Sequence, residues 1–273
     1  MEFDDEVFPS QLEQLLPELR EDDPFQNDFR YDFFISNLIG VDTDTYLLDA
    51  VSEDDPLRDN SNSKPRLPSL KGKGLGAVAI RRIPAGTIVL DDPFALSIQE
   101  PVQEPASEEE AIELLSVVLI QLLTQYIRLP IDARRQFAGL HPHIKPGTHE
   151  WFRSQMRKQG VDFDESELDF VVRLYCTFET NEFSTAMPGG GLNWRIGRLF
   201  LTTSRINHAC QPNTRSRQTS EGHKVVTSIR DIEEGEELTL RYLDHKLFSR
   251  GDWQAETQRI WGFVCNCSGC SSK

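Results

Sequence analysis

The stretch Ile206–Asn213, INHACQPN, decides how this chain of 273 residues is interpreted. It places an amide, an imidazole, a thiol and a proline directly after an apolar run, where a buried strand is expected to end. Polar and reactive side chains concentrated at one such turn indicate a binding or catalytic site. The partners of this turn have to come from other parts of the chain.

A second group of reactive side chains lies near the C-terminus, where Cys265, Cys267 and Cys270 form a C-x-C-x-x-C cluster. Three thiolates do not complete a tetrahedral zinc site, so a fourth ligand is needed from elsewhere. The candidates with suitable donor atoms are Cys210, Cys176, His208, His141 and His143. Cys210 is the better positioned thiol because it follows a strand, whereas Cys176 falls inside a predicted helix. Spacing alone leaves the choice open.

The net charge of −15 belongs to one segment of the chain. Residues 1–63 hold 18 acidic and 3 basic side chains, whereas residues 64–273 hold 26 of each. We expect residues 1–63 to form an acidic, partly disordered arm, ended by the linker-like residues 61–69, SNSKPRLPS. Such an arm could bind basic proteins or fold back on the body.

The cysteine count and the N-terminus both indicate a reducing, intracellular compartment. Five cysteines, three of them in the last nine residues, do not resemble a disulfide scaffold. The acidic N-terminus lacks the basic and apolar regions of a secretory signal. The most apolar run, Leu114–Leu123, is shorter than a membrane span and contains Gln121. We therefore expect a cytoplasmic or nuclear protein with no membrane and no direct nucleic-acid partner.

The body alternates between predicted strands and predicted helices. Leu75–Ile80 and Thr87–Leu90 are apolar and rich in β-branched residues around the turn 84–86, which predicts a hairpin or a pair of short strands. Further strands are predicted at Leu199–Thr203, Lys224–Ile229 and Glu237–Tyr242. A strong helix is predicted after Ser107, which forms a capping pair with Glu110, and it stops at Pro130. Further helices are predicted at Asp132–Ala138, His149–Lys158, Glu165–Phe178 and from Gly251 onward.

These elements predict an α+β fold, a β-rich core interrupted by a helical block at about residues 101–178. The glycine-rich turn Lys71–Gly76, KGKGLG, enters a strand and lacks the helix N-terminus of a phosphate-binding loop. Its backbone could still approach a flat ligand closely. Tyr242 ends the last strand, in GEELTLRYLD, and spacing alone does not assign it a catalytic role.

Four motifs taken in order resemble those of the SET-domain protein lysine methyltransferases. They are KGKGLGAVAIRRIPAGTIV, RINHACQPN, GEELTLRYLD and CNCSGC, and together they cover the body, residues 64–273. The ending WGFVCNC and the segment TNEFST, residues 180–185, are similar to those of the SMYD-like branch. That branch usually carries a MYND zinc finger between the two SET halves. Here the helical insert contains one cysteine, Cys176, so we expect no such finger.

The resemblance implies a SET domain at residues 64–250 and a zinc-binding post-SET segment at residues 251–273. It also implies an S-adenosylmethionine site and one structural zinc. The cofactor-binding residues that it implies are Lys71, Lys73, Gly74, Leu75, Asn181, Asn207, His208, Tyr242, Trp261 and Phe263. The zinc ligands that it implies are Cys210, Cys265, Cys267 and Cys270. Tyr242 would then be the catalytic residue that orients the substrate lysine.

The function that follows from the resemblance is transfer of a methyl group to a lysine side chain of a histone or non-histone protein. The alternative is a catalytically silent SET module that acts as a zinc-stabilised interaction domain. The presence of Asn207, His208 and Tyr242 favours the enzyme. An autoinhibitory arm across the substrate groove would make the whole chain slower than residues 64–273 alone.

Overall fold

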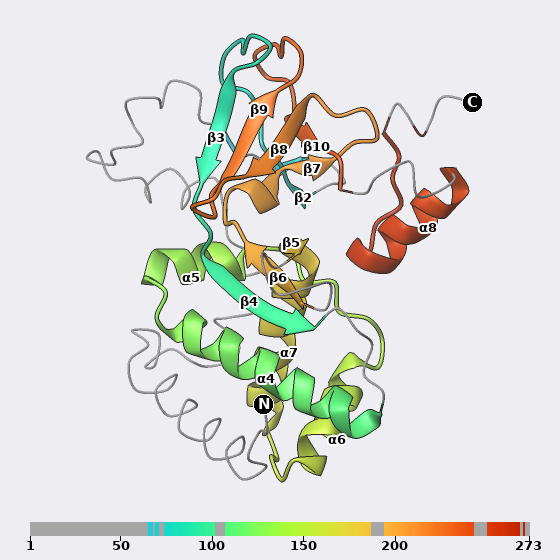
Figure 1. The fold of residues 1–273 in the computed structure, drawn as a ribbon. Coiled ribbons are helices and arrows are strands. Elements are labelled where there is room, and N and C mark those ends of the chain that lie inside the picture. The colour runs from blue at the N-terminus through green and yellow to red at the C-terminus, as the bar shows by residue number, and fades with distance from the viewer. Residues whose placement is uncertain are drawn as a thin grey trace. The chain divides into compact units, whose positions relative to one another are not determined.

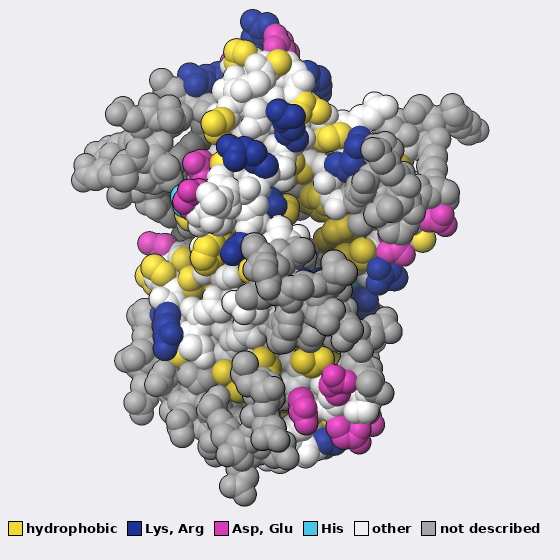
Figure 2. Space-filling view, viewed as in Figure 1, with side chains coloured by type: hydrophobic (Ala, Val, Ile, Leu, Met, Phe, Trp, Pro, Cys, Tyr) yellow, Lys and Arg dark blue, Asp and Glu magenta, His cyan; other side chains and the backbone are white. Residues whose placement is uncertain are grey.

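The computed structural model describes residues 65–67, 69–70, 74–101, 107–186, 194–242, 250–267 and 270. The predicted acidic arm, together with Lys71 and Lys73, lies outside the described residues. The described chain forms two compact units, a helical unit at Ala95–Leu199 and a β unit at residues 65–94 and 200–270. Basic and acidic side chains both occur on the described surface (Figure 2), in keeping with a body that carries 26 of each.

Four helices account for most of the helical unit (Figure 1). They are α4 (Glu108–Ile127), α5 (Ile131–Ala138), α6 (Thr148–Lys158) and α7 (Glu165–Asn181). The Ser107 side chain accepts from the Glu110 N–H at the start of α4, and Asp164 forms a capping box with Glu167 at the start of α7. The predicted helices are confirmed, and α7 continues three residues beyond the predicted end.

Helix α4 supplies much of the core of the helical unit. Leu119, Leu122 and Leu123 are fully buried on one of its faces. Helix α4 has 20 residues and is long and apolar enough to cross a membrane, by length and composition alone. The prediction that the apolar run in this helix is too short for a membrane span is therefore wrong on length. Because one face packs into the protein core, its apolar composition is that of a core helix.

The helical unit also contains a three-stranded antiparallel sheet that was not predicted. Its order is β4 (Leu96–Pro101), β6 (Trp194–Leu199) and β5 (Glu182–Ala186). The edge strand β4 is covered by two glutamines of α4. Gln125 exchanges side-chain hydrogen bonds with the backbone of Ser97, and Gln121 does so with Gln99. These polar residues within an apolar helix therefore satisfy a sheet edge.

A group of acidic side chains surrounds Arg195 in this sheet. Arg195 lies 2.8 Å from a Glu100 oxygen and 3.4 Å from a Glu182 oxygen. Burial, reinforced by Glu182 and Glu100 and opposed by Arg195, raises the pKa of the nearby Glu179 carboxyl to about 8. A raised pKa means that the folded state binds this proton more tightly than the unfolded state does. The resulting stability is fully present below about pH 4.5 and is lost as the pH rises towards 8.

We expect Glu179→Gln to unfold at a higher temperature than the wild type at pH 8 to 9, because the amide cannot ionise. The difference should shrink as the pH falls towards about 5, which thermal unfolding across this pH range would measure. The exposed Glu150 of α6 offers a control, since Glu150→Gln should shift the unfolding temperature little at any pH. A Glu179→Gln effect that does not depend on pH would contradict the prediction.

The β unit contains short strands that come from distant parts of the chain (Figure 1). Its main sheet is antiparallel, in the order β3 (Ile88–Asp92), β9 (Lys224–Ser228) and β8 (Thr214–Gln218). Two smaller pairs are β1 (Ser69–Leu70) with β2 (Gly74–Leu75), and β7 (Asn207–His208) with β10 (Thr239–Leu240). A 3-10 helix, η3 (Thr203–Arg205), precedes β7, and α8 (Arg250–Trp261) follows β10.

Several strand predictions need correction. Leu75–Ile80 and Thr87–Leu90 do not form a hairpin, because β3 pairs with β9. The alternative, a pair of short strands, is confirmed at Thr87–Leu90 as β3, and Leu75–Ile80 contributes the end of β2 and a bridge at Val78. The predicted strand Leu199–Thr203 is instead the end of β6 followed by η3. Lys224–Ile229 is confirmed as β9, whereas Glu237–Tyr242 is a strand only at β10.

The core of the β unit is formed by small and branched side chains from all these segments. They are Ala77, Ala79, Ile83, Val89, Leu90, Ile206, Val226, Ile232, Leu238 and Leu240. Tyr242 packs against this core. The first residue of the INHACQPN stretch is therefore a core residue, and the polar residues after it lie at the edge of the core. The predicted α+β class is confirmed.

Candidate functional site

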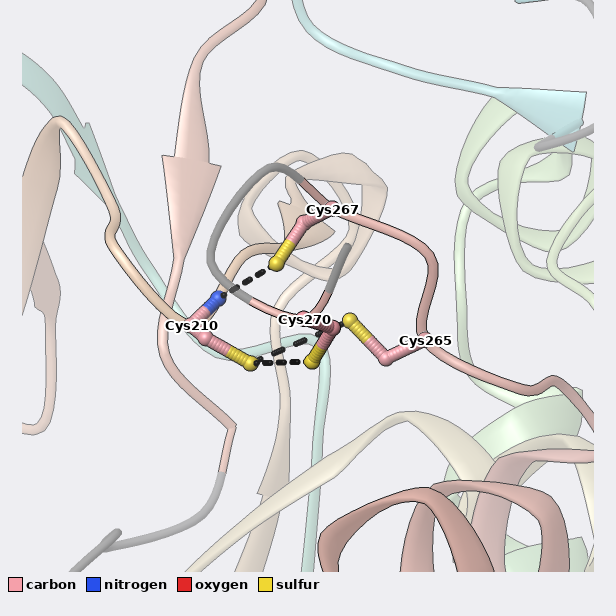
Figure 3. A group of neighbouring side chains, drawn as sticks. All are labelled: Cys210, Cys265, Cys267 and Cys270. Atoms are coloured by element: carbon pink, nitrogen blue, oxygen red, sulfur yellow. Dashed lines mark hydrogen bonds between the residues drawn. The ribbon is translucent and has the colours of Figure 1, made fainter. Parts of the chain in front are cut away.

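Four cysteine sulfurs from two separate segments meet in the β unit (Figure 3). The Cys210 sulfur lies 3.2 Å from that of Cys270 and 3.9 Å from that of Cys265, and all four sulfurs lie within 4.8 Å of one another. Sulfurs bound to one tetrahedral zinc at about 2.3 Å would be about 3.8 Å apart. The four cysteines therefore fit a structural zinc site.

Backbone N–H groups around the cluster favour the thiolate form of Cys267. The Cys210 N–H donates to the Cys267 sulfur at 3.4 Å. Burial alone would raise the pKa of Cys267, but the N–H groups of Cys210 and Cys270 and the adjacent thiols together lower it to about 7. Burial raises the pKa of Cys265 to about 11. A bound cation would favour the thiolate form of all four.

His208 contacts this cluster through one ring nitrogen and the backbone of Tyr242 through the other. The Tyr242 N–H donates to Nδ1 of His208 at 3.2 Å, and Nε2 lies 3.5 Å from the Cys210 sulfur. Burial, aided by the positive charge of Arg241, lowers the pKa of His208 to about 4. A neutral imidazole that accepts at Nδ1 carries its proton on Nε2. His208 is therefore arranged to donate towards the cluster rather than to bind a metal.

The other candidates for a fourth ligand lie in the helical unit. Cys176 is in α7, and His141 and His143 lie between α5 and α6. Among the described residues, the thiol that joins the three C-terminal cysteines is Cys210.

The hydroxyl group of Tyr242 contacts the first residue of the INHACQPN motif. It donates to the backbone carbonyl of Ile206 at 2.7 Å. Burial, reinforced by Glu237, raises the pKa of the Tyr242 phenol above its ordinary value. The hydroxyl therefore stays protonated at physiological pH and acts as a hydrogen-bond donor, not as a base.

Asn207 connects the motif to the glycine-rich turn. Its amide nitrogen donates to the carbonyl of Leu75 at 3.2 Å and to a carboxylate oxygen of Glu237 at 3.0 Å. Its backbone lies in β7, which pairs in parallel with β10. Three sequence motifs that are far apart in the chain, at residues 71–76, 206–213 and 235–244, thus meet at Asn207.

The close approach of these segments requires glycine at position 76. A Cβ atom on Gly76 would lie 2.3 Å from Cδ1 of Leu70 and 2.7 Å from Nδ2 of Asn207. We expect Gly76→Ala to displace the Asn207 amide and to cost about 1–3 kcal/mol of stability. It should also weaken binding of S-adenosylmethionine, the cofactor that the resemblance implies. Thermal unfolding and calorimetric titration with S-adenosylmethionine would measure the two effects.

Gly86→Ala is a matched control for this prediction. Gly86 has a φ of +80° but open space around its Cα, so alanine there introduces backbone strain of about 1–2 kcal/mol without a clash. It should lower the unfolding temperature while leaving cofactor affinity unchanged. Equal affinities in the two variants would refute the role assigned to Gly76.

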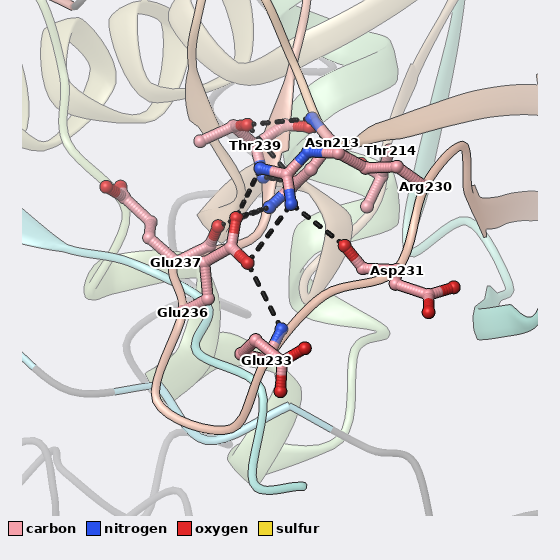
Figure 4. A network of polar contacts seen from close by, with 8 residues as sticks. All are labelled: Asn213, Thr214, Arg230, Asp231, Glu233, Glu236, Glu237 and Thr239. Atoms are coloured by element: carbon pink, nitrogen blue, oxygen red, sulfur yellow. Dashed lines mark hydrogen bonds and ion pairs between the residues drawn. The ribbon is translucent and has the colours of Figure 1, made fainter. Parts of the chain in front are cut away.

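The last residue of INHACQPN, Asn213, fixes the strand that leads to Tyr242 (Figure 4). Its side chain is 1% exposed, accepts from the Thr239 N–H at 2.8 Å and donates to the Glu237 carbonyl at 2.8 Å. It also donates to the Glu236 carboxylate, which forms an ion pair with Arg230. Asn213 was not among the predicted site residues, although the INHACQPN motif contains it.

A buried carboxylate, also missed by the sequence analysis, fixes the start of the motif. Oδ2 of Asp92, at the end of β3, accepts from the N–H groups of Thr202 and Thr203 and from the Thr203 hydroxyl. These bonds cap η3, which leads directly into Ile206. Burial raises the pKa of Asp92, and the three hydrogen bonds oppose that effect. Nothing in the local sequence distinguishes Asp92 from its neighbour Asp91.

Aromatic side chains from the C-terminal segment surround His208 and Tyr242. The ring of Trp261 lies 5.0 Å from that of Tyr242, and the ring of Phe263 lies 6.3 Å from that of His208, both measured between centroids. Trp253, which the sequence analysis did not name, lies 5.4 Å from His208. The rings of Trp261 and Phe263 are partly exposed and could receive a flat ligand, whereas Trp253 is buried.

Comparison with known families agrees with this arrangement. The family profile described as the SET domain matches residues 74–243, which is more than half of the chain. The chain belongs to the SET-domain family. The predicted resemblance is therefore confirmed, and the SET-domain match begins at the glycine-rich turn and ends one residue after Tyr242.

Relatives of this SET-domain chain include proteins named as lysine methyltransferases. The chain is 38% identical over 97 residues to histone-lysine N-methyltransferase SET5 of Meyerozyma guilliermondii, covering 34% of this chain and 20% of that protein. It is 32% identical over 111 residues to human protein-lysine N-trimethyltransferase SMYD5, covering 39% and 25%. It is 23% identical over 181 residues to SmydA-8, isoform B, of Drosophila melanogaster, covering 63% and 37%. The chain thus spans between about a fifth and two fifths of these relatives.

The remaining candidates for cofactor binding, Gly74 and Asn181, belong to different units of the chain. Gly74 has a φ of +71° and is exposed at the start of β2, next to Leu75. Asn181 lies at the end of α7 in the helical unit, where its amide donates to the carbonyls of His141 and Thr177. Its predicted contact with the cofactor stays a prediction.

Proposed function

We propose that this SET-domain chain transfers a methyl group from S-adenosylmethionine to the side-chain amine of a lysine in a protein substrate. The observation that carries the proposal is the Tyr242 hydroxyl, which is held on the Ile206 carbonyl beside the Asn207–His208 strand. Family membership supports it, as do relatives named histone-lysine or protein-lysine methyltransferases.

The described residues suit the proposed cofactor. Gly74 is exposed and the carbonyl of Leu75 accepts from Asn207, and the rings of Trp261 and Phe263 lie next to Tyr242 and His208. We assign cofactor binding to this group of residues and to Asn181. We assign contacts with the carboxylate of S-adenosylmethionine to Lys71 and Lys73. When bound, S-adenosylmethionine supplies a methyl group already activated by its sulfonium charge.

The residues of the chain would then have to position a neutral amine. A lysine amine has a reference pKa of about 10.4, and it attacks only without its proton. Desolvation at an aromatic-lined site lowers that pKa. The phenolic proton of Tyr242 is donated to the Ile206 carbonyl, so its oxygen would orient the amine by accepting an N–H from it. The carbonyls of Arg205 and Ile206 would act as weak acceptors at the reaction centre. Positioning of this kind can lower the activation free energy of a reaction by about 7–11 kcal/mol in favourable cases.

We further propose that Cys210, Cys265, Cys267 and Cys270 hold one structural zinc. The donor set and the sulfur distances support this assignment. Because Cys210 follows β7 and the other three follow α8, the metal would tie the C-terminal aromatic residues to the Asn207–His208 strand. A group of four cysteines that fits a metal site and relatives named histone methyltransferases support an intracellular location, in the nucleus or the cytoplasm.

Transfer of labelled methyl groups from S-adenosylmethionine to histones and to a whole-cell protein extract would test the function. The full chain and its Tyr242→Phe variant should be compared. Lysine labelling by the wild type that is strongly reduced in the variant is the expected result. A wild-type protein that holds zinc and binds the cofactor, yet labels neither histones nor any protein in the extract, would favour a silent interaction module.

A further inference from the structure

Trp253 is a buried aromatic residue in the first turns of α8. Its side chain is 4% exposed, and its ring lies 5.4 Å from the His208 ring with 35° between the two planes. The next residue, Gln254, donates to the carbonyl of Cys265 at 3.0 Å. Consecutive residues of α8 therefore contact the Asn207–His208 strand and the cysteine cluster.

The orientation of the His208 ring matters because both of its nitrogens are engaged. Nδ1 accepts from the Tyr242 N–H, and Nε2 faces the sulfur of Cys210. If the ring flipped, a carbon would face the Tyr242 N–H and leave a buried donor without its acceptor. The native orientation therefore fixes the backbone of Tyr242 relative to the cysteine cluster.

Other rings also approach His208, but Trp253 differs from them. Tyr242 and Phe263 lie 5.3 and 6.3 Å from His208, and both are partly exposed. Trp253 is the buried member of the group, and it packs against the His208 ring. Its contribution is therefore one of shape and packing against the imidazole.

We propose that Trp253 is a positioning residue for methyl transfer, which holds the His208 imidazole in the orientation that fixes the amide and hydroxyl of Tyr242. The role in methyl transfer rests on the proposed function. The claim that Trp253 holds the orientation of the His208 ring does not depend on it. Trp253 touches neither of the reacting groups directly and acts through His208. A small displacement of Tyr242 would misalign the amine that its hydroxyl orients.

The full chain should be compared with Trp253→Phe and Trp253→Ala. Because phenylalanine keeps an aromatic face against His208, Trp253→Phe should retain most of the wild-type kcat. Trp253→Ala should lower kcat about 10- to 100-fold with little change in the KM for S-adenosylmethionine and with one zinc per chain retained. Phe137→Ala is a matched control, because Phe137 is a buried aromatic of the helical unit.

A second readout does not depend on activity. In protein labelled with 15N-histidine, long-range nitrogen–proton spectra report which nitrogen of each imidazole is protonated. Wild type and Trp253→Phe should show His208 as a single Nε2–H form, and Trp253→Ala should show a mixture of forms. Spectra of a Phe137→Ala sample should match those of the wild type.

The two readouts separate failure of the inference from failure of the proposed function. If no protein is methylated by the wild type but the His208 signal changes in Trp253→Ala, the positioning role stands and the function does not. A Trp253→Ala variant with wild-type kcat or an unchanged His208 signal would overturn the inference. So would a loss of kcat in Trp253→Phe equal to that in Trp253→Ala. If Trp253→Ala does not fold, the kcat and His208 signal of Trp253→Leu decide the question in the same way.

Discussion

Tyr242→Phe is expected to lower kcat for lysine methylation by about 10²–10³-fold, the effect seen when one preorganised donor is removed from an active site. The change deletes the hydroxyl that donates to the Ile206 carbonyl and leaves the aromatic ring and the Tyr242 N–H in place. Affinity for S-adenosylmethionine should therefore change by no more than a few-fold. Initial rates with a labelled cofactor and calorimetric titration would measure the two quantities.

The matched control is Tyr126→Phe, because Tyr126 is a buried tyrosine of α4 in the helical unit. It could lower the unfolding temperature through lost packing or hydrogen bonding, but it should leave kcat near the wild-type value. If Tyr242→Phe retained more than about a tenth of the wild-type kcat, the role assigned to its hydroxyl would be wrong. A parallel loss of kcat in both variants would indicate general destabilisation instead.

Cys210→Ser is expected to reduce bound zinc from one ion per chain to nearly none. Cys210 is the proposed ligand that lies outside the C-terminal segment, so its loss should release the segment from β7. Loss of a structural metal belongs to the class of changes that cost more than about 4 kcal/mol. Metal analysis, thermal unfolding and the fluorescence of Trp253 and Trp261 would record the change. Cofactor binding should weaken with it because Phe263 lies in the released segment.

Cys176→Ser makes the same chemical exchange at a buried cysteine in α7, away from the cluster. It should lose some packing energy and keep its zinc. If both variants bind one zinc per chain, Cys210 is not a ligand. If both lose it, the loss reflects unfolding, and chelation of the wild type by a metal-binding dye would then be needed to count the thiolates released.

Helices were predicted well because their signals are local. Ser107 and Asp164 cap the helices that follow them, and apolar residues at helical spacing mark the buried faces. Strands were predicted less well because short, polar strands have no local signal. Strand β8 has the sequence TRSRQ, and it is a strand because its backbone pairs with β9. The glutamines of α4 likewise make sense only once β4 lies beside them.

The residues of the candidate site also divide into those that the sequence indicated and those that only the structure revealed. The family resemblance named Asn207, His208, Cys210 and Tyr242 as site residues, and the structure brings them together. Asp92, Asn213 and Trp253 were missed because each acts on a residue distant in the sequence. An aspartate or a tryptophan in isolation gives no sign of which hydrogen bond or ring it will meet.

The sequence by itself determined the family, the α+β class, the helices and the identity of the reactive side chains. Residue types and their order are sufficient for these, since motifs and helix caps act over a few residues. Only the tertiary structure showed that the sulfur of Cys210 lies within 4.8 Å of the three C-terminal sulfurs, and that β7 and β10 pair in parallel. Those outcomes depend on packing between segments about 30 to 60 residues apart, where many pairings satisfy the local pattern and only the folded core selects one.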